Sequence, residues 1–87
     1  MVHETHAEVV NRLKRAKGHL QKIIAMIDEG RSCIEVAQQL HAVEKALLQA
    51  KKTFIHDHID HCLQGSVESG RNARDLLDEF KAISKYL

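Results

Sequence analysis

The chain has 87 residues, of which 44% are hydrophobic and 29% charged, with no proline and no tryptophan. This length allows one small core, and a formal net charge of +1 favours neither nucleic acid nor an acidic partner for the molecule as a whole. Nothing in the sequence resembles a signal peptide, and the longest purely apolar run is a few residues, so we expect no membrane span. We therefore expect one cytoplasmic domain over residues 1–87. In that compartment cysteines are more often metal ligands or reactive thiols than partners in a disulfide, and we expect the same of the two cysteines here.

A first helix is predicted over residues 7–29, because apolar residues recur there at alternating spacings of four and three. They are Val9, Leu13, Ala16, Leu20, Ile23 and Ile27. Gly30 then ends this helix. Ser32-Cys33-Ile34-Glu35 has the form of a capping box, with Ser32 as the N-cap and Glu35 reaching back, which places Cys33 in the first turn of a second helix.

The second helix is expected to be long, roughly 30 residues, because no glycine or proline occurs before Gly65. It keeps the same apolar spacing at Val36, Leu40, Val43, Leu47, Ala50 and Phe54, and His58 follows in the series. The polar segment GSVESGRN is predicted to be a linker to a shorter third helix. That helix has its apolar face at Ala73, Leu76, Phe80, Ile83 and Leu87. The pattern predicts an all-α fold, a three-helix protomer with a long central helix.

Residues that bind metals occur at the start and near the end of the second helix. His58 and Cys62 are four residues apart and share one helical face, as a chelating pair does. Cys33 lies about 37 Å from His58 on a continuous helix that rises about 1.5 Å per residue, too far for one coordination sphere. If this helix pairs antiparallel with its copy, Cys33 of one chain meets His58 and Cys62 of the other, and two-fold symmetry repeats the site. The spacing therefore predicts an obligate dimer.

Simpler explanations exist for single residues of this kind. An isolated histidine on a helix is more often solvated or hydrogen-bonded than a ligand, which is what we expect of His19, His41 and His56. Cys62 by itself could be a buried core thiol. The combination of Cys33 with the His58–Cys62 pair is harder to obtain by chance and favours a metal site.

The first helix also carries a basic segment without an intervening acid: Arg12, Lys14, Arg15, Lys17 and Lys22. In an oligomer these side chains would form a positive surface suited to phosphates, although a solvated helix face is the plain alternative. The second helix could extend this surface with Lys45, Lys51 and Lys52. Aromatic residues are too few for single-stranded nucleic acid, and the second helix is too long for a recognition helix of the helix-turn-helix type.

The stretch RLKRAKGHLQKIIAMIDEGRSC, followed by VAQQLHAVEKAL and HDHIDHC, resembles the CsoR/RcnR family of bacterial metal-sensing and thiol-sensing transcriptional repressors across nearly the whole chain. The resemblance implies an antiparallel four-helix-bundle dimer of three-helix protomers, and a dimer of dimers. It implies binding to operator DNA without a helix-turn-helix, and release when the inducer binds. It places the family's metal ligands on Cys33, His58 and Cys62, a set similar to the copper(I) sensors and to a nickel sensor that adds an N-terminal histidine.

The resemblance also bears on the choice of metal. In the copper sensors a tyrosine precedes the first cysteine and a glutamate of the third helix completes an outer shell, whereas Ser32 and Asp78 fall at or near these places here. The nickel and cobalt branch uses an N-terminal histidine and the amino end of the chain as additional ligands. The family's histidine aligns about two residues before His3, and His3 is the candidate here for a fourth ligand. His6, His61 and the amino terminus are further candidates for a fourth ligand. Two thiolates and one imidazole suit copper(I), and a fourth nitrogen suits nickel(II). We expect a transition metal ion as effector, nickel(II) or cobalt(II) in slight preference to copper(I).

The family's DNA contacts come from basic residues of the first helix, which Arg12 and Arg15 match, with Lys14 and Lys17 beside them. Glu44 stands where an arginine is often found in the second helix, so contacts from that helix are not carried over. The expected partners are double-stranded operator DNA and further copies of this chain, in a homodimer or homotetramer. Neither a membrane nor a small organic substrate is expected.

Two other functions stay open. One is a thiol-reactive sensor of formaldehyde or persulfide that uses Cys33, with Cys62 as the resolving thiol, and does not need His58. The other is a cytosolic metal buffer in which the basic face has no DNA to bind. An enzyme is not expected, because His3-Glu4-Thr5-His6 is one residue short of the zinc-protease pattern.

Overall fold

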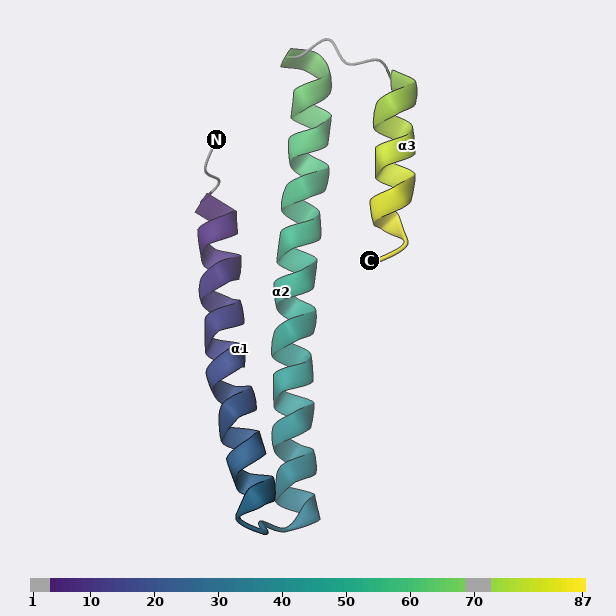
Figure 1. Ribbon diagram of the computed structural model, residues 1–87. Helices are drawn as coiled ribbons and strands as arrows, with labels where there is room; N and C mark the ends of the chain where they lie inside the picture. Colours follow the sequence, from purple (N-terminus) through teal and green to yellow (C-terminus); the bar gives the residue numbers. More distant parts are fainter. Residues whose placement is uncertain (1–3, 69–72) are drawn as a thin grey trace. The chain divides into compact units, whose positions relative to one another are not determined.

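The computed structural model describes residues 4–68 and 73–87, with side chains for residues 5–60 and 74–87. Three α-helices follow one another along the chain: α1 (Glu4–Asp28), α2 (Cys33–Glu68) and α3 (Ala73–Ser84) (Figure 1). No strand occurs within these residues, which confirms the predicted all-α protomer with a long central helix. None of the helices described is both long and apolar enough to cross a bilayer.

The chain divides into two compact units, Met1–Ala50 and Lys51–Leu87. In the first unit, α1 and the first half of α2 run antiparallel, side by side (Figure 1). In the second unit, the remainder of α2 lies antiparallel to α3. Each unit is thus a pair of helices.

The turn between α1 and α2 is built as the sequence predicts. Gly30 adopts the left-handed conformation, with φ of 74°. Its N–H donates to the carbonyl oxygen of Ile27 at 3.1 Å, and the next N–H, that of Arg31, donates to Met26 at 3.0 Å. These two hydrogen bonds form a Schellman motif, which ends a helix at a residue that tolerates positive φ.

The N-terminus of α2 is capped, although only half of the predicted capping box forms. The backbone N–H of Glu35 donates to Oγ of Ser32 at 3.2 Å, as expected of an N-cap serine. The Glu35 carboxylate, however, accepts from Nε of Arg31 at 2.8 Å instead of reaching back to the cap. An arginine one turn earlier offers a charged donor, which competes well with a backbone N–H.

Three predicted boundaries differ from the structure. α1 begins at Glu4, three residues before the expected start. α2 has 36 residues and continues through Gly65 to Glu68, so the first half of the predicted linker is helical. An interior glycine costs about 1 kcal/mol against alanine, which lowers helix stability without ending a long helix. α3 ends at Ser84, before the last predicted apolar residue, Leu87.

Only half of the predicted apolar face of α1 is buried within the chain. Every second member of the apolar series has at most 6% of its surface exposed: Val9, Ala16 and Ile23. The residues between them expose 39% to 57%: Leu13, Leu20 and Ile27. Each heptad therefore places one apolar residue in the hairpin core and leaves the other in solvent.

The first half of α2 repeats this alternation. Val43 and Ala50 are buried, and Val43 packs with Ala16 and Ile23 in one core cluster, against which Val36 also packs. Between them, Leu40 and Leu47 expose 45% and 38%. A second apolar row thus runs along both helices of the first unit, defined by Leu13, Leu20, Ile27, Leu40 and Leu47.

Candidate metal and DNA sites

Cys33 is the first residue of α2, and the N-cap at Ser32 fixes its place there. Its thiol is exposed and forms no disulfide. It borders an apolar pocket of about 360 Å³, whose other lining residues are Ile27, Arg31, Val36, Ala37 and Leu40. Two of these, Ile27 and Leu40, belong to the exposed apolar row, so the candidate ligand lies beside the surface that the chain itself leaves uncovered.

His58 belongs to the second unit, where its Nε2 lies 3.1 Å from Oε1 of Glu79 on α3. The His58 and Glu79 side chains are about two-thirds buried, at 34% and 31% exposed. A carboxylate oxygen can only accept, so Nε2 donates the hydrogen of this contact and Nδ1 is the ring nitrogen that could bind a metal. Histidines that bind metals characteristically donate their second N–H to a carboxylate in this way. The pair therefore fits a metal ligand that would bind through Nδ1.

Glu79 is a functional candidate that the sequence reasoning missed, since Asp78 was matched to the outer-shell acid. The structure puts Asp78 on the exposed side of α3 and Glu79 on the half-buried side. The spacing already indicates that Glu79 lies on the packed face of α3, because Leu76, Glu79 and Ile83 are three and four residues apart and share one helical face. The acid of α3 that lies against His58 is therefore Glu79, whereas the adjacent Asp78 is exposed.

The remaining predicted ligands lie beyond what the structure describes. Cys62 falls within α2, but its side chain, like that of His61, is outside the described side chains, and His3 is outside the described residues. Among the side chains described, no three from His, Cys, Asp and Glu come close enough together to hold a metal ion. Cys33 belongs to the first unit and His58 to the second.

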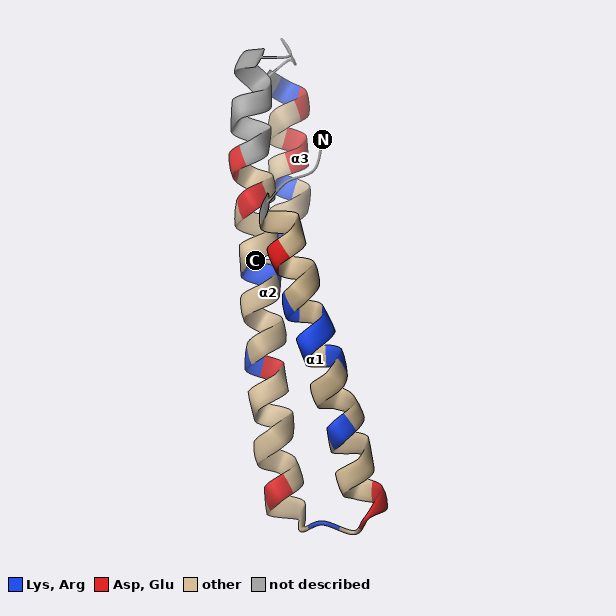
Figure 2. Ribbon diagram, turned by 90° about the vertical axis from the view of Figure 1, so that its left-hand side faces the viewer, with Lys and Arg blue, Asp and Glu red and all other residues tan. Residues whose placement is uncertain are grey.

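The predicted DNA-binding residues lie in the middle of α1, where Figure 2 shows the Lys and Arg positions of the first unit following one another along the helix. Lys14, Arg15 and Lys17 are exposed and Arg12 is half-buried. Arg12 is held by Glu8 one turn earlier, through contacts of 3.3 Å from Nε and 3.1 Å from Nη2 to Oε1.

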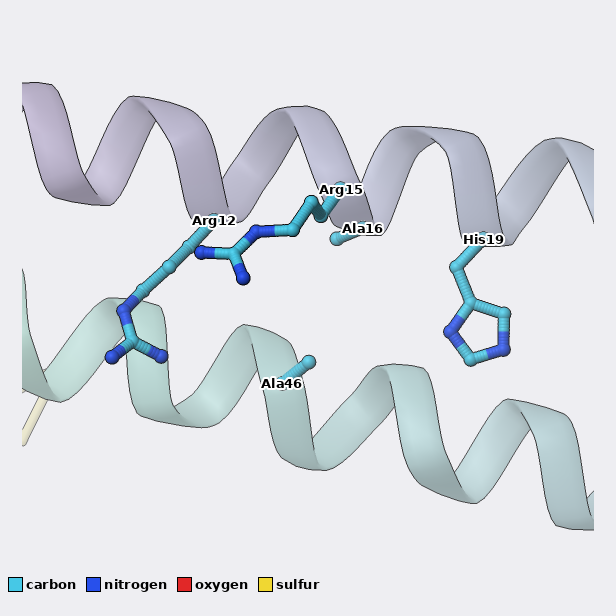
Figure 3. Close-up of a pocket in the computed structure, with 5 residues that line it drawn as sticks. All are labelled: Arg12, Arg15, Ala16, His19 and Ala46. Carbon is cyan, nitrogen blue, oxygen red and sulfur yellow. The ribbon is translucent and has the colours of Figure 1, made fainter.

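His19 lies on the same side of α1 as Arg12 and Arg15 and points toward α2 (Figure 3). Its Nε2–H donates to Oε1 of Gln39 on α2 at 2.6 Å, which confirms a hydrogen-bonded histidine. His41 and His56 are exposed, as expected of solvated side chains.

A long central helix with a thiol at its start and a carboxylate-braced imidazole further along, beside a helix with a basic face, defines an all-helical class of metal-sensing regulators. The chain belongs to the family of metal-sensitive transcriptional repressors, whose family pattern matches residues 5–86. This family consists of regulators rather than enzymes.

Relatives and a solved structure agree with this assignment. The chain is 37% identical over 75 residues to the copper-sensing transcriptional repressor CsoR of Mycobacterium ulcerans, covering 83% of this chain and 64% of that protein. It is 32% identical over 81 residues to CsoR of Bacillus subtilis, covering 90% and 80%. The structure of the nickel-responsive transcriptional regulator InrS superposes with a TM-score of 0.83 at 32% identity, and all of both chains is covered. The chain thus spans slightly less than two-thirds of the mycobacterial relative.

Proposed function

We propose that this chain is a repressor that binds operator DNA in its metal-free form and releases it when a transition metal binds between two subunits. The observation that carries the proposal is the His58–Glu79 pair, which orients an imidazole as metal-binding proteins do. The copper-sensing and nickel-responsive relatives support a soft or borderline ion. With two thiolates and an imidazole, the donor set of Cys33, His58 and Cys62 suits such ions.

A second copy of the chain completes the site in this proposal. The exposed apolar row of the first unit would be in water in an isolated chain, and a copy paired across it would bury it. Because α2 is one continuous helix, Cys33 cannot reach His58 of its own chain. Antiparallel pairing brings Cys33 of one protomer to His58 and Cys62 of the other. A homodimer, and a homotetramer formed from two of them, follow.

Nickel(II) or cobalt(II) is the first effector to test, and copper(I) the second. The histidines at positions 3 and 6 favour a four-ligand site, in which His3 supplies the additional nitrogen that square-planar nickel requires. Glu79 favours copper(I), because it supplies the outer-shell acid that Asp78 did not. An anaerobic titration of the metal-free protein with nickel(II), then with copper(I), distinguishes them. Nickel uptake that His3→Ala abolishes supports nickel, and copper(I) uptake unaffected by His3→Ala supports copper.

DNA binding is assigned to the basic face of α1, with Arg12, Lys14, Arg15 and Lys17 as the contacts. Backbone phosphates dominate such binding, so affinity should fall steeply with salt. Metal binding between subunits would move the helices that carry these residues. By linkage, DNA must then weaken metal binding by the same factor, typically about 1–3 kcal/mol of coupling.

The test is fluorescence anisotropy of a DNA duplex selected from a random pool by the metal-free protein, measured with and without metal. We expect tight binding without metal and release with it. His58→Ala should still bind DNA but no longer release it. If affinity is the same in both states, the repressor mechanism is wrong. If His58→Ala is released normally while Cys33→Ala is not, the protein is a thiol-reactive sensor instead.

A further inference from the structure

A small cationic pocket opens between α1 and α2 within the first unit. It has a volume of about 210 Å³. It is lined by Arg12, Arg15, Ala16 and His19 from α1 and by Ala46 from α2 (Figure 3). Two guanidinium groups and one imidazole, all from α1, therefore line the pocket, and the other two lining side chains are methyl groups.

The pocket is open because two small side chains, Ala16 of α1 and Ala46 of α2, line it where the two helices face each other. Figure 3 shows Ala16 and Ala46 pointing toward one another, with the two arginines to one side and His19 to the other. A larger side chain at either alanine would occupy this space. Ala16 is buried in the hairpin core, whereas Ala46 is exposed, so the pocket can be filled from α2 without disturbing the core.

The charges around the pocket are unequally compensated. Arg12 is paired with Glu8, whose side chain is 54% exposed. No acidic side chain of the described residues pairs with Arg15. Figure 3 shows the Arg15 side chain extending along α1 toward Arg12, so the two arginines lie on the same side of the pocket with one carboxylate as their paired acid. Such an arrangement is favourable when an anion binds between the two cations.

The far wall of the pocket is held in place by a bond between the helices. His19 donates from Nε2 to Oε1 of Gln39 at 2.6 Å, and the bond is partly buried. It joins α1 to α2 one turn beyond Arg15. His19 and Gln39 thus act as positioning residues that keep the pocket at its width.

We infer that this pocket seats one phosphate group, held jointly by Arg12 and Arg15, with the methyl groups of Ala16 and Ala46 as its apolar lining. The inference rests on the proposed function in naming the DNA backbone as the source of that phosphate. Guanidinium groups bind phosphate oxygens bidentately, and a planar fork from each arginine can reach a different pair of oxygens. Glu8 must then yield part of its contact with Arg12 to the phosphate.

The first experiment measures the salt dependence of DNA binding for the metal-free protein, with the selected duplex as probe. One phosphate contact contributes about 0.9 to the slope of log affinity against log salt. Because both arginines of a chain serve one phosphate, the double variant Arg12→Gln, Arg15→Gln should lower the slope by about 0.9 for each chain that contacts the duplex, with the number of bound chains taken from light scattering of the complex. A decrease of about twice that value for each bound chain would mean that the arginines contact separate phosphates and would overturn the shared seat.

A second variant fills the pocket without changing any charge. Ala46→Leu should weaken DNA binding and lower the salt slope by as much as the double arginine variant does, whereas Ala42→Leu, the same substitution at an exposed position one turn earlier on α2, should leave both unchanged. Circular dichroism and light scattering check that both variants fold and assemble as the wild type does. Equal DNA binding by Ala46→Leu and the wild type would overturn the proposal.

A third arm separates this inference from the proposed function and distinguishes the two sources of phosphate. Inorganic phosphate is titrated into the protein while the imidazole resonances of His19 are followed by NMR. A shift of the His19 resonances in the wild type that Ala46→Leu abolishes supports the phosphate site. The site is overturned if the wild-type resonances do not shift at high phosphate and Ala46→Leu binds DNA as the wild type does. If the wild type binds phosphate but no DNA, the proposed function fails and the seat belongs to a free anion.

Discussion

The two units of the chain are both helix pairs built on α2, but different polar contacts join their helices. In the first unit, a hydrogen bond between His19 and Gln39 connects α1 to α2, and Lys14, Arg15 and Lys17 are exposed. In the second, the His58–Glu79 contact connects α2 to α3, and about two-thirds of each side chain is buried. The first arrangement presents charge to an external anion, whereas the second restricts the orientation of one imidazole. In the proposed function, the arginines that bind DNA and the histidine that binds metal therefore belong to different units of one chain.

Cys33 is where this division breaks down, because a candidate metal ligand lies in the unit that carries the basic face. Cys33→Ala should lower the affinity for nickel or copper by more than the roughly 100-fold that loss of an outer-shell partner can cost. Competition with a chelator of known affinity measures this. DNA binding by the metal-free variant should be unchanged. If metal affinity survives the substitution, the metal site lies entirely in the second unit and sensing needs no partner chain.

A charge in the exposed apolar row tests whether a second copy covers the first unit. Leu40→Glu should shift the protein to monomers, because burial of an unpaired carboxylate opposes assembly and the loss of a buried leucine alone costs about 2–5 kcal/mol. Gln38→Glu adds the same charge at another exposed position of α2 and is the control. Light scattering reports the mass of each. An unchanged mass for Leu40→Glu would mean that no copy of the chain covers this row.

The heptad spacing shows what sequence could and could not decide here. It predicted three helices and their apolar faces, and the turn at Gly30 followed from one residue. It could not divide the apolar face between the hairpin core and the exposed row, because both halves of a heptad are equally apolar. That division depends on which side of α1 meets α2, a property of the packed pair.

The candidate site shows a similar limit. Spacing singled out Cys33 and His58 as ligands, because both lie on one predicted helix. The partner of His58 comes from α3, and Asp78 and Glu79 are adjacent acids of similar chemistry. Only the rotation of α3 against α2 selects between them. Likewise Gly65 is a plausible helix end in isolation, and the continuation of α2 overrides its low propensity.

The two adjacent acids provide a matched test of the second unit. Glu79→Gln should lower metal affinity by about 10–100-fold, or roughly 1.4–2.7 kcal/mol, because the amide braces the imidazole without a charge. Asp78→Asn removes the same charge from the exposed face of α3 and should leave the affinity within about twofold of the wild type. Isothermal titration of both variants measures the difference. Equal losses would indicate a general effect of charge rather than orientation of His58.

The smallest expected effects come from two glycines of the first unit, and they have opposite signs. Gly30→Ala places a Cβ at φ of 74° and should destabilise the protein by about 1–2 kcal/mol. Gly18→Ala adds a methyl group to the middle of α1, where nothing lies within 4 Å, and should stabilise it by about 1 kcal/mol. Thermal unfolding at fixed protein concentration should show a Tm change of roughly 4–8 °C per kcal/mol.

Gly18 also tests whether DNA binding depends on the first unit, because it lies between Lys17 and His19 on the helix that is proposed to contact DNA. No internal neighbour requires the absence of its side chain. A Gly18→Ala variant that is more stable but binds DNA more weakly would mean that the glycine permits close approach of the phosphate backbone. Metal affinity should not change with it, because Gly18 is not one of the candidate ligands. If stability rises and DNA binding stays the same, the duplex does not approach this turn of α1 closely.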